Sequence, residues 1–138
     1  MTDSLPTEPQ AAIAFVDSSA IIALVDRHDP THEQALAAYH ELVDEGYCLF
    51  TTNYVIAETL QLLDLSFGPN IARKWLQDHR LPVYHADEQD ERRATARLSS
   101  ARPDSRLSMT DTISSVVMDR LGVSDAFAVD PEFLSDDT

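Results

Sequence analysis

Residues 12–25 have the sequence AIAFVDSSAIIALV, in which one aspartate and two serines separate two apolar runs. The first run, residues 12–16, contains no polar side chain and therefore predicts a strand that is buried on both faces, as in a parallel sheet. The polar residues 17–19 are types that cap helices, so we expect a helix at residues 18–25. A buried strand that leads directly into a helix is the building unit of a parallel α/β sheet.

The same alternation continues along the rest of the chain. Further strands are predicted at residues 47–51, 81–84 and 126–129, and further helices at residues 30–45, 53–65, 70–78, 88–100 and 109–121. Strands that alternate with helices favour one parallel sheet with helices on both faces. Asp17 and Asp130 each directly follow a predicted strand, so we expect both carboxylates at the edge of the sheet where ligand sites form.

Length and composition favour one domain. The 138 residues, 43% of them hydrophobic, supply enough apolar surface for a single core, which we assign to residues 12–138. Residues 1–11 lack the positive start and the apolar core of a signal peptide, and no apolar run approaches the roughly 20 residues of a membrane span. We therefore expect a flexible tail followed by a cytoplasmic domain with no membrane contact. Cys48, the single cysteine, is expected to be a buried small hydrophobe.

The charge of the chain is strongly negative. Twenty-four acidic residues outnumber ten basic ones, which gives a net charge of −14. Such a surface repels phosphate backbones, so contact with RNA has to be local, through a few arginines or through bound metal. Arg73, Lys74 and Arg80 form a compact basic patch that could touch RNA, although a solvated face is the default interpretation. The excess of acids and of arginine over lysine fits either a salt-adapted source or a genome rich in G and C.

One acidic residue lies where a helix is expected to be apolar. Glu58 shares its predicted helical face with Val55, Leu62 and Leu65. A carboxylate in an apolar stripe is costly unless a cation or a hydrogen-bond donor compensates its charge. The position of Glu58 therefore favours a functional role over a structural one.

Three further acids have a structural alternative as helix caps. Asp17 and Asp130 each precede residues that can begin a helix, and Ser108 completes a capping box with Asp111. Each of the three, taken alone, is better explained by capping. If all four acids meet in space, however, they form a carboxylate pocket.

A carboxylate pocket has a definite chemistry. Acids gathered in one place raise the pKa values of one another, and a divalent cation removes that penalty. Mg²⁺ or Mn²⁺ prefers such oxygen ligands, and an ion of this kind can activate water to attack phosphorus. The number of ions, one or two, is left open. Ser19 and Thr110 neighbour the acids in sequence and could hydrogen-bond a ligating carboxylate.

Four segments of the chain, in this order, resemble the PIN domain family. They are VDSSAIIAL, TTNYVIAETLQLL, LSMTDTISSVVMDRLGV and DAFAVDPEF, which lie between residues 12 and 133. The resemblance is to the small single-domain members typified by VapC toxins. It implies a three-layer α/β/α sandwich around a central parallel sheet and a metal-dependent ribonuclease activity, with the family's acidic residues at Asp17, Glu58, Asp111 and Asp130 and its helix-start Ser or Thr at Thr110. Ala128 stands where the family commonly has Thr or Ser.

The resemblance also implies partners. VapC-like proteins act on RNA as toxins paired with an antitoxin protein, and small PIN domains of this type pair as homodimers. Apolar residues Ile56, Leu60 and Leu63 on one predicted helix are interpreted as extending beyond the core stripe, which agrees with a dimer. We expect an antitoxin to place a basic side chain in the acidic pocket, because arginine pairs well with carboxylates.

Several other functions stay open or are disfavoured. An RNA-processing nuclease without an antitoxin and a non-catalytic PIN-like RNA-binding or scaffold protein both remain alternatives to the toxin. An aspartyl phosphatase needs a second acid two residues after Asp17, where Ser19 stands. A phosphorylatable receiver domain needs a lysine after a late strand, but the single lysine is Lys74 in a mid-chain helix.

Overall fold

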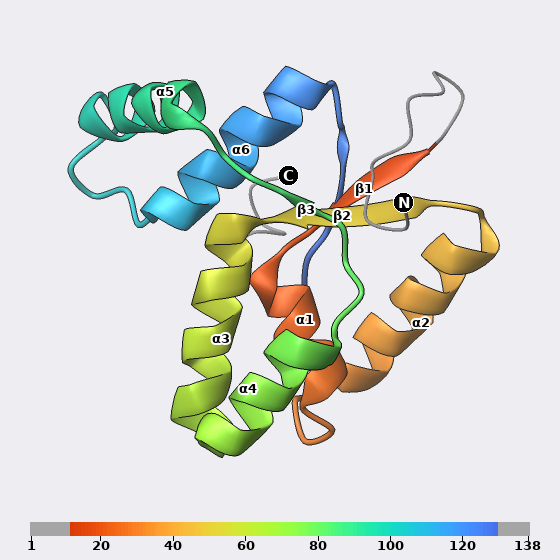
Figure 1. Cartoon of the computed structure of the whole chain (residues 1–138). Coiled ribbons are helices and arrows are strands. Elements are labelled where there is room, and N and C mark those ends of the chain that lie inside the picture. Colours follow the sequence, from red (N-terminus) through yellow and green to blue (C-terminus); the bar gives the residue numbers. More distant parts are fainter. Residues whose placement is uncertain (1–11, 130–138) are drawn as a thin grey trace.

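The computed structural model describes residues 12–129, which form a four-stranded parallel sheet with helices on both faces (Figure 1). The strands are β1 (Ile13–Val16), β2 (Cys48–Thr52), β3 (Val83–Tyr84) and β4 (Asp125–Phe127), in the order β3-β2-β1-β4. The helices are α1 (Ser18–Val25), α2 (His32–Asp44), α3 (Asn53–Phe67), α4 (Pro69–Asp78), α5 (Glu88–Ser99) and α6 (Met109–Leu121). The predicted three-layer α/β/α sandwich is confirmed.

The helices divide into two groups around the sheet. Figure 1 shows α5 and α6 on one side and α1, α2 and α4 on the other. The first helix begins directly after β1, because Asp17 has an extended backbone and its side chain accepts a hydrogen bond from the N–H of Ser19. The third begins directly after β2, where the side chain of Thr52 accepts from the N–H of Val55. Both helices therefore start at the same edge of the sheet.

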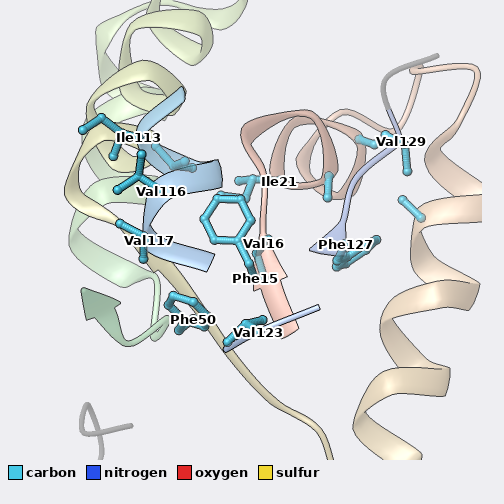
Figure 2. Packing of buried hydrophobic residues seen from close by; sticks show 14 of the residues in the cluster. Phe15, Val16, Ile21, Phe50, Ile113, Val116, Val117, Val123, Phe127 and Val129 are labelled. Carbon is cyan, nitrogen blue, oxygen red and sulfur yellow. The ribbon is translucent and has the colours of Figure 1, made fainter. Parts of the chain in front are cut away.

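One part of the core lies between β1, β2 and α6, and the same cluster continues to Ile21 of α1 and Phe127 of β4. Figure 2 shows Val116 and Val117 of α6 beside Phe15 and Phe50, whose rings meet edge to face at 5.7 Å between centroids. All four side chains are buried. Burying an aromatic or branched aliphatic side chain stabilises a fold by about 1.5–3 kcal/mol, so this contact fixes α6 against the sheet.

The last strand is shorter than predicted. It ends at Phe127, which pairs with Val16, so Asp130 is not the first residue after the strand. The strand stops because the N–H of Val129 donates to the hydroxyl of Ser19 at 3.2 Å instead of to a neighbouring strand. Asp130 itself, like the predicted tail at residues 1–11, lies outside the described residues.

The third helix buries a different stripe from the predicted one. Its core side is made by Val55, Thr59 and Leu63, which are all fully buried, whereas Leu62 is 38% exposed and Leu65 is 78% exposed. Leu63 therefore belongs to the core, and its interpretation as a residue beyond the core stripe is wrong. The prediction failed because an apolar residue at helical spacing can face the core or the edge of the molecule, and spacing alone does not distinguish the two.

Cys48 is half-buried rather than buried, because it lies at the beginning of β2 beside a cleft. Among the described helices, none is both long and apolar enough to cross a bilayer.

Candidate functional site

Asp17 lies at the carboxyl end of β1 with its side chain buried. Its carboxylate accepts hydrogen bonds from the backbone N–H and the hydroxyl of Ser19, at 3.2 and 2.8 Å. Burial raises the pKa of Asp17 above its ordinary value, and the negative charge of Asp111 raises it further, while the bonds from Ser19 lower it in part. The capping role predicted for Asp17 is therefore present, and a second acid lies close enough to affect its ionisation.

Glu58 lies in the first half of α3 and has an unsatisfied oxygen. Its Oε2 atom is buried and has no hydrogen-bond partner among the described residues. Burial raises the pKa of Glu58, and the charges of Asp111 and Asp17 add to this effect, while a hydrogen bond from the side chain of Thr110 opposes it. A buried carboxylate oxygen without a donor is costly, so this atom indicates a missing partner.

Asp111 occupies the first turn of α6. It forms a capping box with Ser108: the N–H of Asp111 donates to the Ser108 hydroxyl at 3.1 Å, and the N–H of Ser108 donates to the Asp111 carboxylate at 3.2 Å. The prediction of a capping box is confirmed. The box also fixes the direction of the Asp111 side chain, and it brings Thr110 within reach of Glu58.

Three of the four predicted acids thus come together from three separate elements. Asp17, Glu58 and Asp111 share no ion pair with any lysine or arginine in the described part of the chain. Within residues 12–129, no three His, Cys, Asp or Glu side chains are grouped closely enough to hold one metal ion. The fourth acid, Asp130, lies outside these residues, but the preceding Val129 contacts Ser19, the residue that binds Asp17.

The donor atoms of the cluster are of the kind that a hard divalent cation prefers. All its donor atoms are carboxylate or hydroxyl oxygens, which Mg²⁺ and Mn²⁺ prefer. The unpartnered Oε2 of Glu58 provides an acceptor, and no basic side chain among the described residues neutralises the charge. The donor set therefore fits such an ion in chemical type, while the three described carboxylates are not grouped closely enough to hold it by themselves.

The predicted basic patch lies elsewhere. Arg73 and Lys74 are on α4, which begins after the C-terminal end of α3 (Figure 1), whereas Glu58 is near the other end of that helix. Lys74 pairs with Asp78 at 3.1 Å on an exposed surface. Arg80 is exposed in the connection between α4 and β3. The structure therefore gives this patch no contact with the three acids.

The raised pKa values predict how the metal-free protein responds to pH. A carboxyl whose pKa is higher in the folded than in the unfolded state destabilises the fold above the folded pKa, and this cost disappears as the pH falls towards the unfolded value near 4. In a chelator, we expect Glu58→Gln to melt above the parent protein at pH 8, with the difference shrinking towards pH 4. Melting by circular dichroism across this range measures the effect.

Glu41→Gln provides the matched control. Glu41 is an exposed glutamate on α2 without an ion pair among the described residues, so its substitution should leave the pH dependence unchanged. Saturating Mn²⁺ should reverse the order of Glu58→Gln and the parent, because the ion stabilises only the intact site. A Glu58→Gln protein that melts below the parent at pH 8 in chelator would mean that Glu58 stabilises the fold.

Comparison with known proteins gives one family and a close structural relative. The model of the PIN domain family matches residues 14–135 of the chain. The solved structure of Mycobacterium tuberculosis VapC20, described as a sarcin-ricin loop cleaving toxin, superposes with a TM-score of 0.73 and 26% identity, over 91% of this chain and 95% of that one. No curated protein matches the chain.

Proposed function

The chain belongs to the PIN domain family, and from this membership we propose that it is a divalent-metal-dependent endoribonuclease, the toxin of a type II toxin–antitoxin pair. Its likeness to VapC20, a toxin that cleaves the sarcin-ricin loop, supports both the activity and the biological role. The observation that carries the proposal is the cluster of Asp17, Glu58 and Asp111, in which the buried Oε2 of Glu58 has no partner among the described residues.

In this proposal, four acids bind the metal ion and two hydroxyl groups orient the acids. Asp17, Glu58, Asp111 and Asp130 would hold Mg²⁺ or Mn²⁺, which when bound supplies positive charge to the phosphate and activates water. The hydroxyl of Ser19 orients the Asp17 carboxylate at 2.8 Å, and that of Thr110 orients Glu58. Such bonds restrict each carboxylate to one direction before the ion arrives.

Metal removal is the direct test. We expect the purified protein to cleave RNA containing the sarcin-ricin loop with Mg²⁺ or Mn²⁺, and to lose all cleavage in a chelator. Activity should return when Mn²⁺ is added in excess of the chelator. Gel analysis of end-labelled RNA measures both steps. Cleavage that survives chelation would contradict the proposal, and absence of cleavage with either ion would favour the non-catalytic RNA-binding or scaffold alternative.

The role as a toxin is separate from the chemistry. A nuclease that processes RNA without an antitoxin would contain the same site. We propose an antitoxin that places an arginine against the three carboxylates, because the described structure leaves them without a cationic partner and bidentate arginine pairs are strong. An antitoxin gene adjacent to this one, whose product inhibits cleavage, would support the toxin.

A homodimer is also proposed, from an apolar patch at the junction of two helices. Leu62, Leu65 and Phe67 at the end of α3 and Ile71 at the start of α4 are 36% to 78% exposed. Exposed apolar side chains that occur so close together in the chain favour an association surface. We expect a dimer at micromolar concentration by light scattering, and Leu65→Glu should convert it to a monomer. Leu107→Glu, at a site that is 54% exposed outside this patch, is the control and should leave the dimer intact.

A further inference from the structure

A cleft of about 460 Å³ opens on the side of the sheet that α1 and α4 cover. Its walls come from six strands and helices, namely β1, α1, α2, β2, α4 and β4, and from the connection between α4 and β3. None of the three clustered acids lines it. Its volume falls within the range of about 300–1,000 Å³ that is typical of small-molecule sites.

The lining of the cleft is mainly apolar and includes a flat aromatic wall. The ring of Trp75 stacks on that of His79 at 5.0 Å between centroids and 21° between planes. Leu24, Leu49 and Phe127 face the same space. A ligand that enters this cleft would therefore gain most of its affinity by burying a compact apolar body.

The charge of the cleft is opposite to that of the protein. The chain has a net charge of −14, yet among the described residues no aspartate or glutamate lines the cleft, while Arg80 does. Arg80 is exposed and forms no ion pair within the described part of the chain, unlike Lys74 on the neighbouring helix, which is bound to Asp78. A guanidinium that has no ion pair with residues 12–129 and lies beside an apolar cavity favours an anionic group at that position.

We propose that this cleft binds a small amphipathic carboxylate, with its apolar body against Trp75 and its carboxylate facing Arg80. The volume of the cleft limits the size of the ligand. The apolar walls favour an apolar ligand body, and Arg80 favours a negatively charged head group. The site is distinct from the acidic cluster, so this inference does not depend on the proposed nuclease activity.

The tryptophan provides a built-in reporter for the test. Trp75 is the single tryptophan of the chain, so its fluorescence reports events in the cleft alone. The probes are phenylbutyrate, phenylbutanol and phenylbutylamine, which share one apolar body and differ in the head group. We expect each to change the Trp75 emission, with phenylbutyrate binding about fivefold more tightly than the alcohol, as one exposed ion pair allows, and the amine binding most weakly.

Two arginine variants test whether Arg80 causes the preference for phenylbutyrate over phenylbutanol. Arg80→Gln should bind phenylbutyrate no more tightly than phenylbutanol, while its affinity for the alcohol stays the same. Arg73→Gln, which removes another exposed arginine, on α4 and outside the lining, should keep the fivefold preference. Both substitutions are on the surface, so the fold should be unaffected.

Three outcomes would overturn the proposal. The first is a preference for the carboxylate that survives in Arg80→Gln, and the second is an amine that binds as tightly as the acid. The third is an apparent affinity for phenylbutyrate that falls as the protein concentration rises, because a second copy of the chain would then be the occupant of the cleft.

Discussion

Asp17→Asn is expected to lower the rate of RNA cleavage by about a thousand-fold, equal to about 4 kcal/mol of transition-state stabilisation, while the fold stays intact. The amide keeps the oxygen that accepts hydrogen bonds from Ser19, so the cap of α1 should survive. What the substitution removes is the negative charge beside Asp111 and Glu58. Initial rates of cleavage at saturating Mn²⁺, with melting temperatures measured in parallel, test both parts.

The chain contains a control with nearly the same local geometry. Asp29 accepts hydrogen bonds from the backbone N–H and the hydroxyl of Thr31, as Asp17 does from Ser19. Asp29 lies before α2, and no neighbouring acid raises its pKa, which is lowered by its bonds to Thr31. Asp29→Asn should therefore cleave RNA at the parental rate. Equal activities of the two variants would show that Asp17 is only a helix cap.

The order of the strands and helices was predictable because each carries a local signal. The helices at α1 and α6 were predicted with the bounds they have in the structure, since a cap precedes each and apolar spacing continues to its end. The failures have a different origin. Phe127 ends β4 because Val129 bonds to Ser19, a residue 110 positions away. Contacts between residues so far apart in the sequence depend on the folded structure. They cannot be predicted from the residue types of a short segment.

The candidate site was predictable in part for the same reason. Asp17 and Asp111 stand at strand and helix ends, which parallel topology brings to one edge of the sheet. Glu58 was noticed because its charge conflicted with an apolar stripe, although that stripe proved to be exposed at Leu65. The cleft at Trp75 and Arg80 was not predicted, because its walls come from segments with no shared motif.

A hydrogen-bond network around Asp90 could not be predicted from the sequence, and we expect its loss to have a large effect on stability. Asp90 on α5 is fully buried and accepts hydrogen bonds from Arg120 on α6 at 2.8 Å, from the Tyr84 hydroxyl at 3.2 Å and from the Asp87 N–H at 3.0 Å. The cap at Asp87 was predicted, but the burial of its partner was not. The bond between Asp90 and Arg120 joins α5 to the helix that carries Asp111.

We expect Asp90→Ala to lower the free energy of unfolding by about 2–3 kcal/mol, because it removes three hydrogen bonds to a buried carboxylate, while the half-exposed Arg120 keeps its ion pair with Asp87. Arg97 and Asp119 supply the comparison, since they join the same two helices at the same 2.8 Å distance but with side chains that are 45% and 67% exposed. Asp119→Ala should cost less than about 1 kcal/mol, because exposed pairs contribute little. Urea denaturation of the two variants measures the difference. Equal losses would mean that the link between α5 and α6 stabilises the fold whether or not it is buried. The larger loss that we expect for Asp90→Ala would mean that Asp90 holds α6 in place, and Asp111 with it.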